Sequence, residues 1–114
     1  MHYIRIYHYI CSINAIKMKR ENVLKRLQSL KGSLGKVGVT QLGLFGSTVR
    51  GENTSRSDID ILLDFDARHE TYVNFLAACR ILEDNFRRNK VDVVTYKGLS
   101  PYIGKTIMKE VVYV

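Results

Sequence analysis

The sequence feature that most constrains this chain is the stretch 42–65, which reads LGLFGSTVRGENTSRSDIDILLDF. A short apolar run passes directly into Gly46 and Ser47, and ten residues later the chain carries Asp58 and Asp60 with one isoleucine between them. Apolar runs that are interrupted by a glycine turn are typical of buried strands. The order therefore predicts a strand, a phosphate-binding turn and a second strand with paired carboxylates.

The spacing of the two carboxylates predicts a metal site. Side chains alternate along a strand, so Asp58 and Asp60 share one face of an expected strand 58–65, while Ile59 and Ile61 point into the core. Two carboxylates on one face repel each other unless a cation lies between them. Oxygen ligands of this kind suit Mg²⁺, which completes its coordination shell with waters and substrate phosphates.

The glycine–serine turn predicts the phosphate side of the same site. Gly46 lets the backbone approach a phosphate closely, and Ser47 brings an amide and a hydroxyl to the start of the next helix. Each half of the motif is weak alone, because strand ends often carry acidic residues for solubility. Their combination in this order favours a metal–triphosphate site over a solvated acidic pair.

The same residues resemble those of a known family. Gly46-Ser47, ten intervening residues and Asp58-Ile59-Asp60 match the pattern of the polymerase-β-like nucleotidyltransferase superfamily. In particular, FGSTVRG followed by SDIDILLDF is similar to the minimal nucleotidyltransferases, small proteins paired with HEPN-domain partners in prokaryotic toxin–antitoxin modules.

The resemblance covers roughly residues 18–114 and includes VDVVTY at 91–96. One position departs from it: Thr48 stands where family members often carry arginine, whereas Arg50 and Gly51 match. The resemblance implies an α/β (α+β) fold, a small mixed β-sheet flanked by helices that forms a polymerase-β-like nucleotidyltransferase palm core.

The family's third carboxylate falls at Asp92, within the β-branched run 91–95. From the residues alone, Asp92 is either a carboxylate at a strand edge or part of the same cleft, if that strand pairs with the acidic one. The resemblance implies that the catalytic and metal-binding residues, holding two Mg²⁺ ions, are Asp58, Asp60 and Asp92. It likewise assigns the phosphates of ATP to Gly46, Ser47 and Arg50.

The implied activity is that of an antitoxin that transfers AMP from ATP to a tyrosine hydroxyl of a partner HEPN toxin, in a hetero-oligomer. With 114 residues the chain has no room for a separate acceptor-binding domain, so the acceptor surface must come from another molecule. Two alternatives remain: a non-enzymatic antitoxin that acts by binding, and a nucleotidyltransferase that modifies RNA or a small molecule with a separate helical subunit.

Composition narrows the setting. A net charge of +7 attracts polyanions, so direct binding to nucleic acid is possible. It is not the favoured interpretation, because aromatic residues do not alternate with the basic ones as they do in single-strand-binding surfaces. No apolar run has the length of a membrane span, which predicts no membrane association. Cys11 and Cys79 form neither a disulfide framework nor a zinc motif. A reducing, cytoplasmic location follows as the default.

The remaining pattern predicts alternating helices and strands around the motif. Residues 1–17 are expected to form an N-terminal extension outside the catalytic domain 18–114, as an added edge strand or an upstream extension of the reading frame. Helical spacing predicts one helix from Lys19 to Leu30 that ends near Gly32. The other expected elements are a strand at 39–45, a short helix and polar loop at 48–57 with turn residues Gly51, Asn53 and Ser55, a helix from Tyr72 to Phe86, a strand at 91–95, a helix from Ser100 and Pro101, and an extended tail at 111–114.

Two further expectations concern side chains of the helix 72–86 and the tyrosines. An apolar stripe that starts at Tyr72 is expected to pack into the core, with Glu83 largely off it. Four tyrosines are expected to be half-buried packing residues; they are Tyr72, Tyr96, Tyr102 and Tyr113.

Overall fold

The computed structural model describes residues 17–114, so nearly all of the expected N-terminal extension lies outside the described residues. Helices and strands alternate along the described chain. In order they are α2 (Arg20–Gly35), β1 (Val39–Phe45), α3 (Ser47–Arg50), β2 (Ile59–Phe65), α4 (Tyr72–Asn85), β3 (Val91–Thr95), the 3₁₀ turn η2 (Tyr96–Gly98), α5 (Pro101–Glu110) and β4 (Val112–Tyr113).

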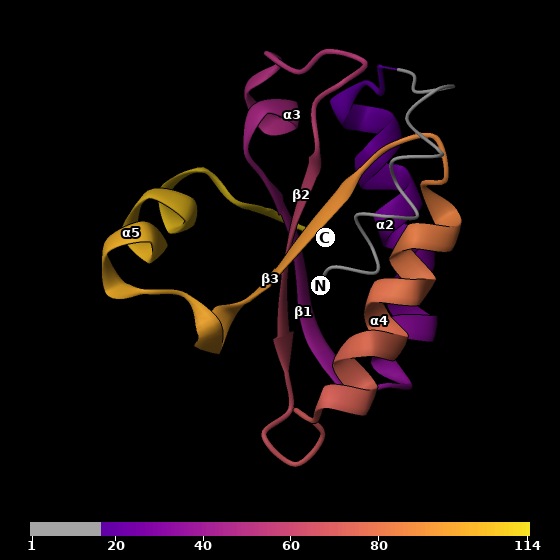
Figure 1. Ribbon diagram of the computed structural model, residues 1–114, viewed down its shortest axis with the longest axis vertical. Helices are drawn as coiled ribbons and strands as arrows, with labels where there is room; N and C mark the ends of the chain where they lie inside the picture. Colours follow the sequence, from indigo (N-terminus) through magenta and orange to yellow (C-terminus); the bar gives the residue numbers. More distant parts are fainter. Residues whose placement is uncertain (1–16) are drawn as a thin grey trace.

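The four strands form one mixed sheet in the order β3-β2-β1-β4. Strand β1 runs antiparallel to both β2 and β4, whereas β2 and β3 are parallel. Helices α2 and α4 cover one face of the sheet, and α5 lies on the other (Figure 1). The expected small mixed sheet with flanking helices is therefore confirmed.

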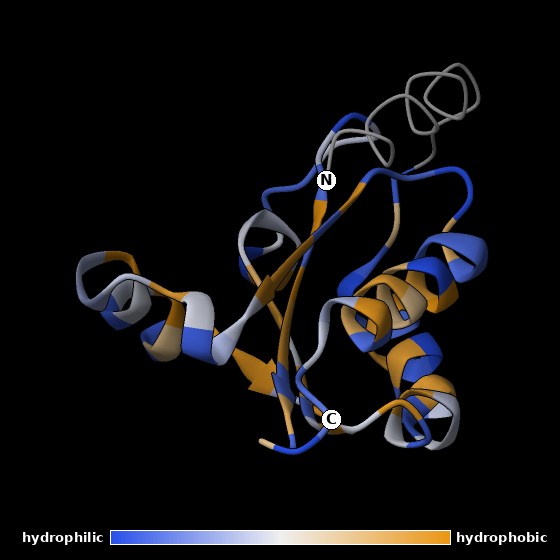
Figure 2. Cartoon of the chain, turned by 60° about the horizontal axis from the view of Figure 1, so that its bottom comes forward, coloured by the Kyte–Doolittle hydropathy of each residue, from blue (hydrophilic) through white to orange (hydrophobic). Residues whose placement is uncertain are grey.

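The core has two parts, one on each face of the sheet. The larger part packs α2 and α4 against the sheet and includes Leu27, Leu34, Ile61, Leu63, Cys79 and Phe86. The smaller part lies on the α5 face and consists of Phe45, Leu62 and Ile107. Hydrophobic residues accordingly run along the strands and the inward sides of α2 and α4 in Figure 2. Full burial of each such side chain contributes about 1.5–3 kcal/mol to the free energy of unfolding.

The end of α2 differs from the sequence expectation. The helix does not end near Gly32 but continues to Gly35, and the N–H of Lys36 donates to the carbonyl of Gly32. Leu34 is fully buried, so it extends the apolar stripe by one more turn. Burying a leucine is worth more than the cost of about 1 kcal/mol for a glycine inside a helix.

The polar loop after α3 is more ordered than its composition indicates. Gly51 ends α3 with a left-handed φ of 74°, as expected of a turn residue. Asn53, in contrast, is buried, and its side-chain Nδ2 donates to the carbonyl of Met18 at 2.8 Å. This hydrogen bond ties the loop to the start of the described chain.

The C-terminal elements follow the expected caps. The Ser100 hydroxyl accepts a hydrogen bond from the amide of Ile103, and Pro101 occupies the first turn of α5. The extended tail forms strand β4, in which Tyr113 pairs with Gly43 of β1. No helix in the range 17–114 is long and apolar enough to cross a membrane.

The side-chain expectations for α4 and the tyrosines were wrong in part. Tyr72 is 74% exposed, because it begins α4 and the first buried residue of the helix is Ala78. Glu83, expected off the apolar stripe, is only 7% exposed, and burial raises the pKa of its carboxyl. Tyr102 is almost fully exposed, and Tyr96 and Tyr113 are also exposed rather than half-buried.

Candidate active site

The sheet places two of the predicted carboxylates side by side. Asp60 on β2 is in register with Asp92 on the parallel strand β3. Registered residues of neighbouring strands point to the same face, and the strands lie about 4.8 Å apart. On β2 the neighbours Ile59 and Ile61 are buried in the core with α2 and α4, as the alternation predicted. Asp60 and Asp92 therefore lie on the face that carries α5.

Asp58 immediately precedes β2 and is half-buried, so the strand begins one residue later than predicted. Burial, then the negative charges of Asp92 and Asp58, raise the pKa of Asp60 to about 7. The three aspartates are thus close enough to influence one another electrostatically. Bringing a divalent cation to such a group would offset the repulsion among its charges.

The donor chemistry of this group fits Mg²⁺, but its side chains are not gathered into a ready-made cage. Carboxylate oxygens are the hard ligands that Mg²⁺ prefers. Within residues 17–114, however, no group of three His, Cys, Asp or Glu side chains lies close enough together to hold a metal ion. Binding one ion with all three aspartates would therefore require their side chains to come closer together.

Gly46 lies directly against the Asp60 carboxylate. Its φ is 79°, and a Cβ atom at this position would collide with the carboxylate oxygen of Asp60. The carbonyl of Gly46 accepts hydrogen bonds from the amides of Val49 and Arg50, which begins the short helix α3. Only glycine satisfies both conditions, so this turn brings bare backbone next to the acidic strand.

Arg50 extends the turn toward α5. Its Nη1 donates to Glu110 Oε2 at 2.7 Å, and its Nε donates to Glu52 Oε1 at 2.9 Å. Hydrogen bonds to Glu52 and Glu110 raise the pKa of Arg50. Ser47, the first residue of α3, is half-buried beside this cluster. The predicted phosphate-binding residues are therefore neighbours at one end of the sheet.

Sequence reasoning missed Glu110. Its second oxygen, Oε1, accepts a hydrogen bond from the amide of Gly46 at 3.1 Å. The two residues are far apart in the sequence, so no local spacing could reveal the contact. One signal was available: an acidic residue in the last turn of a helix opposes the helix dipole, which indicates a partner elsewhere.

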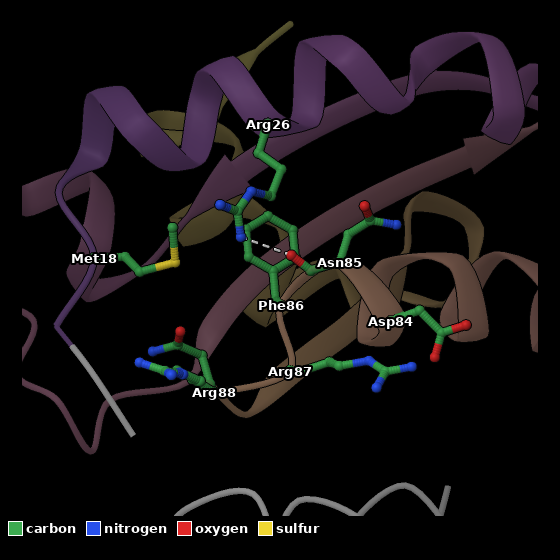
Figure 3. Close-up of a pocket in the computed structure, with 8 residues that line it drawn as sticks. Met18, Arg26, Asp84, Asn85, Phe86, Arg87 and Arg88 are labelled. Atoms are coloured by element: carbon green, nitrogen blue, oxygen red, sulfur yellow. Dashed lines mark hydrogen bonds between the residues drawn. The ribbon is translucent and has the colours of Figure 1, made fainter. Parts of the chain in front are cut away.

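A cavity of about 400 Å³ lies beside the ends of α2 and α4, lined by Met18, Arg26 and residues 84–89 (Figure 3). Arg26 Nη1 donates to the carbonyl of Asn85 at 2.8 Å, and the guanidinium lies over the ring of Phe86. None of the predicted site residues lines this cavity. The carboxylates and the glycine turn are therefore separate from it.

Comparison with known proteins shows the family. A family model for the nucleotidyltransferase domain matches residues 20–114. The protein adenylyltransferase MntA of Thermococcus cleftensis is 42% identical over 77 residues, which cover 68% of this chain and 76% of that protein. The MJ1379 protein of Methanocaldococcus jannaschii is 33% identical over 108 residues, covering 92% of this chain and 97% of that protein.

Solved structures give the same result. A minimal nucleotidyltransferase superposes with a TM-score of 0.72 at 26% identity, over 83% of this chain and 95% of that chain. A toxin–antitoxin structure with AMP-PNP has a TM-score of 0.59 at 19% identity, over 84% of this chain and 72% of that chain. At this identity the similarity supports the fold alone. The chain therefore belongs to the nucleotidyltransferase domain family and is an enzyme of the minimal nucleotidyltransferase type.

Proposed function

We propose that this chain is an antitoxin that transfers AMP from ATP, with Mg²⁺, to a tyrosine hydroxyl of a HEPN-domain toxin with which it assembles in the cytoplasm. The observation that carries the proposal is the registered pair Asp60 and Asp92 beside Gly46. Carboxylates next to bare backbone suit a metal-bound triphosphate. A relative named as a protein adenylyltransferase supports a protein acceptor.

In this proposal Asp58, Asp60 and Asp92 hold Mg²⁺, with two ions expected. When bound, Mg²⁺ neutralises phosphate oxygens and makes the α-phosphorus more electrophilic. The backbone at Gly46 and Ser47 binds the β- and γ-phosphates. Much of the rate enhancement would come from this positioning and charge stabilisation, as in other phosphoryl transfers.

The chemical step is an in-line displacement at the α-phosphorus. The tyrosine oxygen forms a bond to phosphorus, and its proton passes to the Asp92 carboxylate. The bond from the α-phosphorus to the oxygen that bridges to the β-phosphorus breaks, and pyrophosphate leaves with the electron pair. Arg50 stabilises the charge that develops on the leaving group.

Exposure of Asp92 favours a macromolecular acceptor. Asp60 is half-buried between β1 and β3, whereas the Asp92 side chain is exposed. A base at the surface can contact a hydroxyl group that another protein presents. A small enclosed pocket could not admit such a protein. The partner toxin would thus supply the acceptor surface for this single domain.

The first prediction tests the metal assignment. Asp60→Asn should lower AMP transfer by at least about a hundredfold, because the amide holds Mg²⁺ poorly and leaves the triphosphate without charge compensation. Transfer is measured with α-labelled ATP, Mg²⁺ and the purified partner toxin. Asp84→Asn, an exposed change of the same charge on α4, is the matched control and should retain full transfer.

Activity of Asp60→Asn within about fivefold of the original protein would refute the assignment. The label also distinguishes other functions. A toxin that is neutralised without acquiring label would indicate an antitoxin that acts by binding alone. Label on transfer RNA or an aminoglycoside in place of the toxin would indicate a different acceptor, with the toxin serving as the helical subunit.

A further inference from the structure

Glu110 fills the position where the proposed function puts a phosphate. One of its carboxylate oxygens accepts from the amide of Gly46 at 3.1 Å, and the other accepts from the Arg50 guanidinium at 2.7 Å. Both oxygens of one anion are therefore bound by the turn. The side chain of Glu110 is 21% exposed, against 65% for Glu52, the other acidic partner of Arg50.

The contacts of this carboxylate are those of a bound phosphate. A backbone amide and a guanidinium are both common donors to phosphate oxygens, and the guanidinium binds carboxylate and phosphate alike. Gly46 has its amide toward Glu110, and its α-carbon lies against Asp60. A triphosphate that reached both the acidic strand and the turn would need the same two donors.

The helix that carries Glu110 is held lightly at this end. Among the residues of α5, Ile107 is the one that is buried, and Tyr102 and Ile103 are exposed. Beyond Glu110 the chain is held by the two-residue strand β4 and by Val111 and Val114, which are only partly buried against the core. The Glu110 side chain can therefore leave the turn without disrupting the main core, which lies on the opposite face of the sheet (Figure 1).

We propose that Glu110 is an internal competitor of the nucleotide: its carboxylate occupies the amide of Gly46 and the guanidinium of Arg50, and ATP binds by displacing it. This inference rests on the proposed function of the turn. By linkage, the free energy that holds Glu110 on the turn is subtracted from the free energy of ATP binding. Glu110 thereby sets the affinity of the site and couples nucleotide binding to the end of α5.

The test compares three variants by calorimetric titration with ATP in the presence of Mg²⁺. Glu110→Gln and Glu110→Ala should lower the dissociation constant about threefold to tenfold, since the competing charge is gone. Glu52→Gln removes the same charge from the same arginine but makes no contact with Gly46, so its dissociation constant should change less than about twofold. Circular dichroism shows whether each variant is folded. If Glu110→Ala unfolds, Glu110→Gln still tests the inference, because glutamine keeps the shape of the glutamate side chain.

Unchanged or weaker ATP binding by folded Glu110→Gln would overturn the inference, because Glu110 would then position the turn instead of competing for it. An equal gain in Glu52→Gln would overturn it as well, since net charge alone would explain the effect. Binding and transfer separate the two proposals. Tighter ATP binding without transfer to the toxin would sustain the competitor and refute the function, and transfer with unchanged affinity would do the reverse. Lack of ATP binding in every protein would refute both.

Discussion

At the scale of single residues, the ionised Asp60 carboxylate lowers the stability of the folded protein. Its pKa is about 7 in the folded chain, against 3.8 for an unperturbed aspartate. Between these values the folded state binds more protons than the unfolded state, so stability falls as the pH rises through this window. The cost is absent below about pH 4 and fully present above pH 7.

Asp60→Asn should therefore stabilise the metal-free protein at pH 8 and change its stability little at pH 4. We expect a gain on the order of 1–2 kcal/mol in the free energy of unfolding, after allowance for solvent screening of a half-buried side chain. Urea unfolding in the presence of EDTA measures it, with Asp84→Asn as the control. A lower stability of Asp60→Asn at pH 8 would contradict the cost inferred from burial of the Asp60 charge and its repulsion by Asp92 and Asp58.

Substitutions at Gly46 and Gly51 test whether the glycine turn needs close contact with Asp60 or only its backbone conformation. Both have a positive φ, 79° and 74°, but a Cβ atom would collide with Asp60 only at Gly46, and at Gly51 it would meet nothing within 4 Å. Alanine at either position costs about 1–2 kcal/mol of backbone strain. Gly46→Ala should in addition abolish ATP binding in a calorimetric titration, whereas Gly51→Ala should keep it. Equal affinities in the two variants would show that Gly46 serves only the backbone conformation.

At the scale of elements, the periodicity of hydrophobic residues predicted where helices and strands lie. Their ends depend on tertiary contacts, which this periodicity does not reveal. Helix α2 runs past Gly32 because Leu34 finds a buried site. The tail was expected to be extended, yet its pairing with Gly43 depends on a strand some seventy residues earlier. Asn53 is likewise buried and donates a hydrogen bond to the carbonyl of Met18. Turn propensity does not predict this contact.

Gly43 decides whether β4 can dock. A Cβ atom there would lie 2.6 Å from the side chain of Val111 and 3.2 Å from Tyr113. Gly43→Ala should therefore push β4 off the sheet, lower the free energy of unfolding by about 1–3 kcal/mol and speed hydrogen exchange at residues 111–114. Gly32→Ala has open space around the new methyl and should stabilise α2 by up to about 1 kcal/mol. Unchanged exchange in Gly43→Ala would show that β4 is not held by this close approach.

At the scale of the whole molecule, the sequence predicted most of the candidate site because its parts lie within one short stretch. Gly46, Asp58 and Asp60 follow from local order, and Asp92 needed the family resemblance, since parallel pairing cannot be read from spacing. The contact of Glu110 with Gly46 could not be predicted, because the two residues are far apart in the sequence. Sequence alone also could not show that, within residues 17–114, the three aspartates do not form a ready-made metal site, because this depends on where their side chains lie.

The division of the chain at Met18 remains a proposal, and Met18 itself supplies its sharpest test. This residue is 8% exposed within the main core, and its carbonyl accepts the buried Asn53 side chain. We expect a chain that begins at Met18 to melt within about 3 °C of the full chain and to bind ATP equally well. Met18→Ala in the full chain should instead lose about 2 kcal/mol, since it leaves a cavity in the core. Should the shortened chain fail to fold or bind ATP more than about threefold more weakly, residues 1–17 belong to the catalytic domain and not to an extension of it.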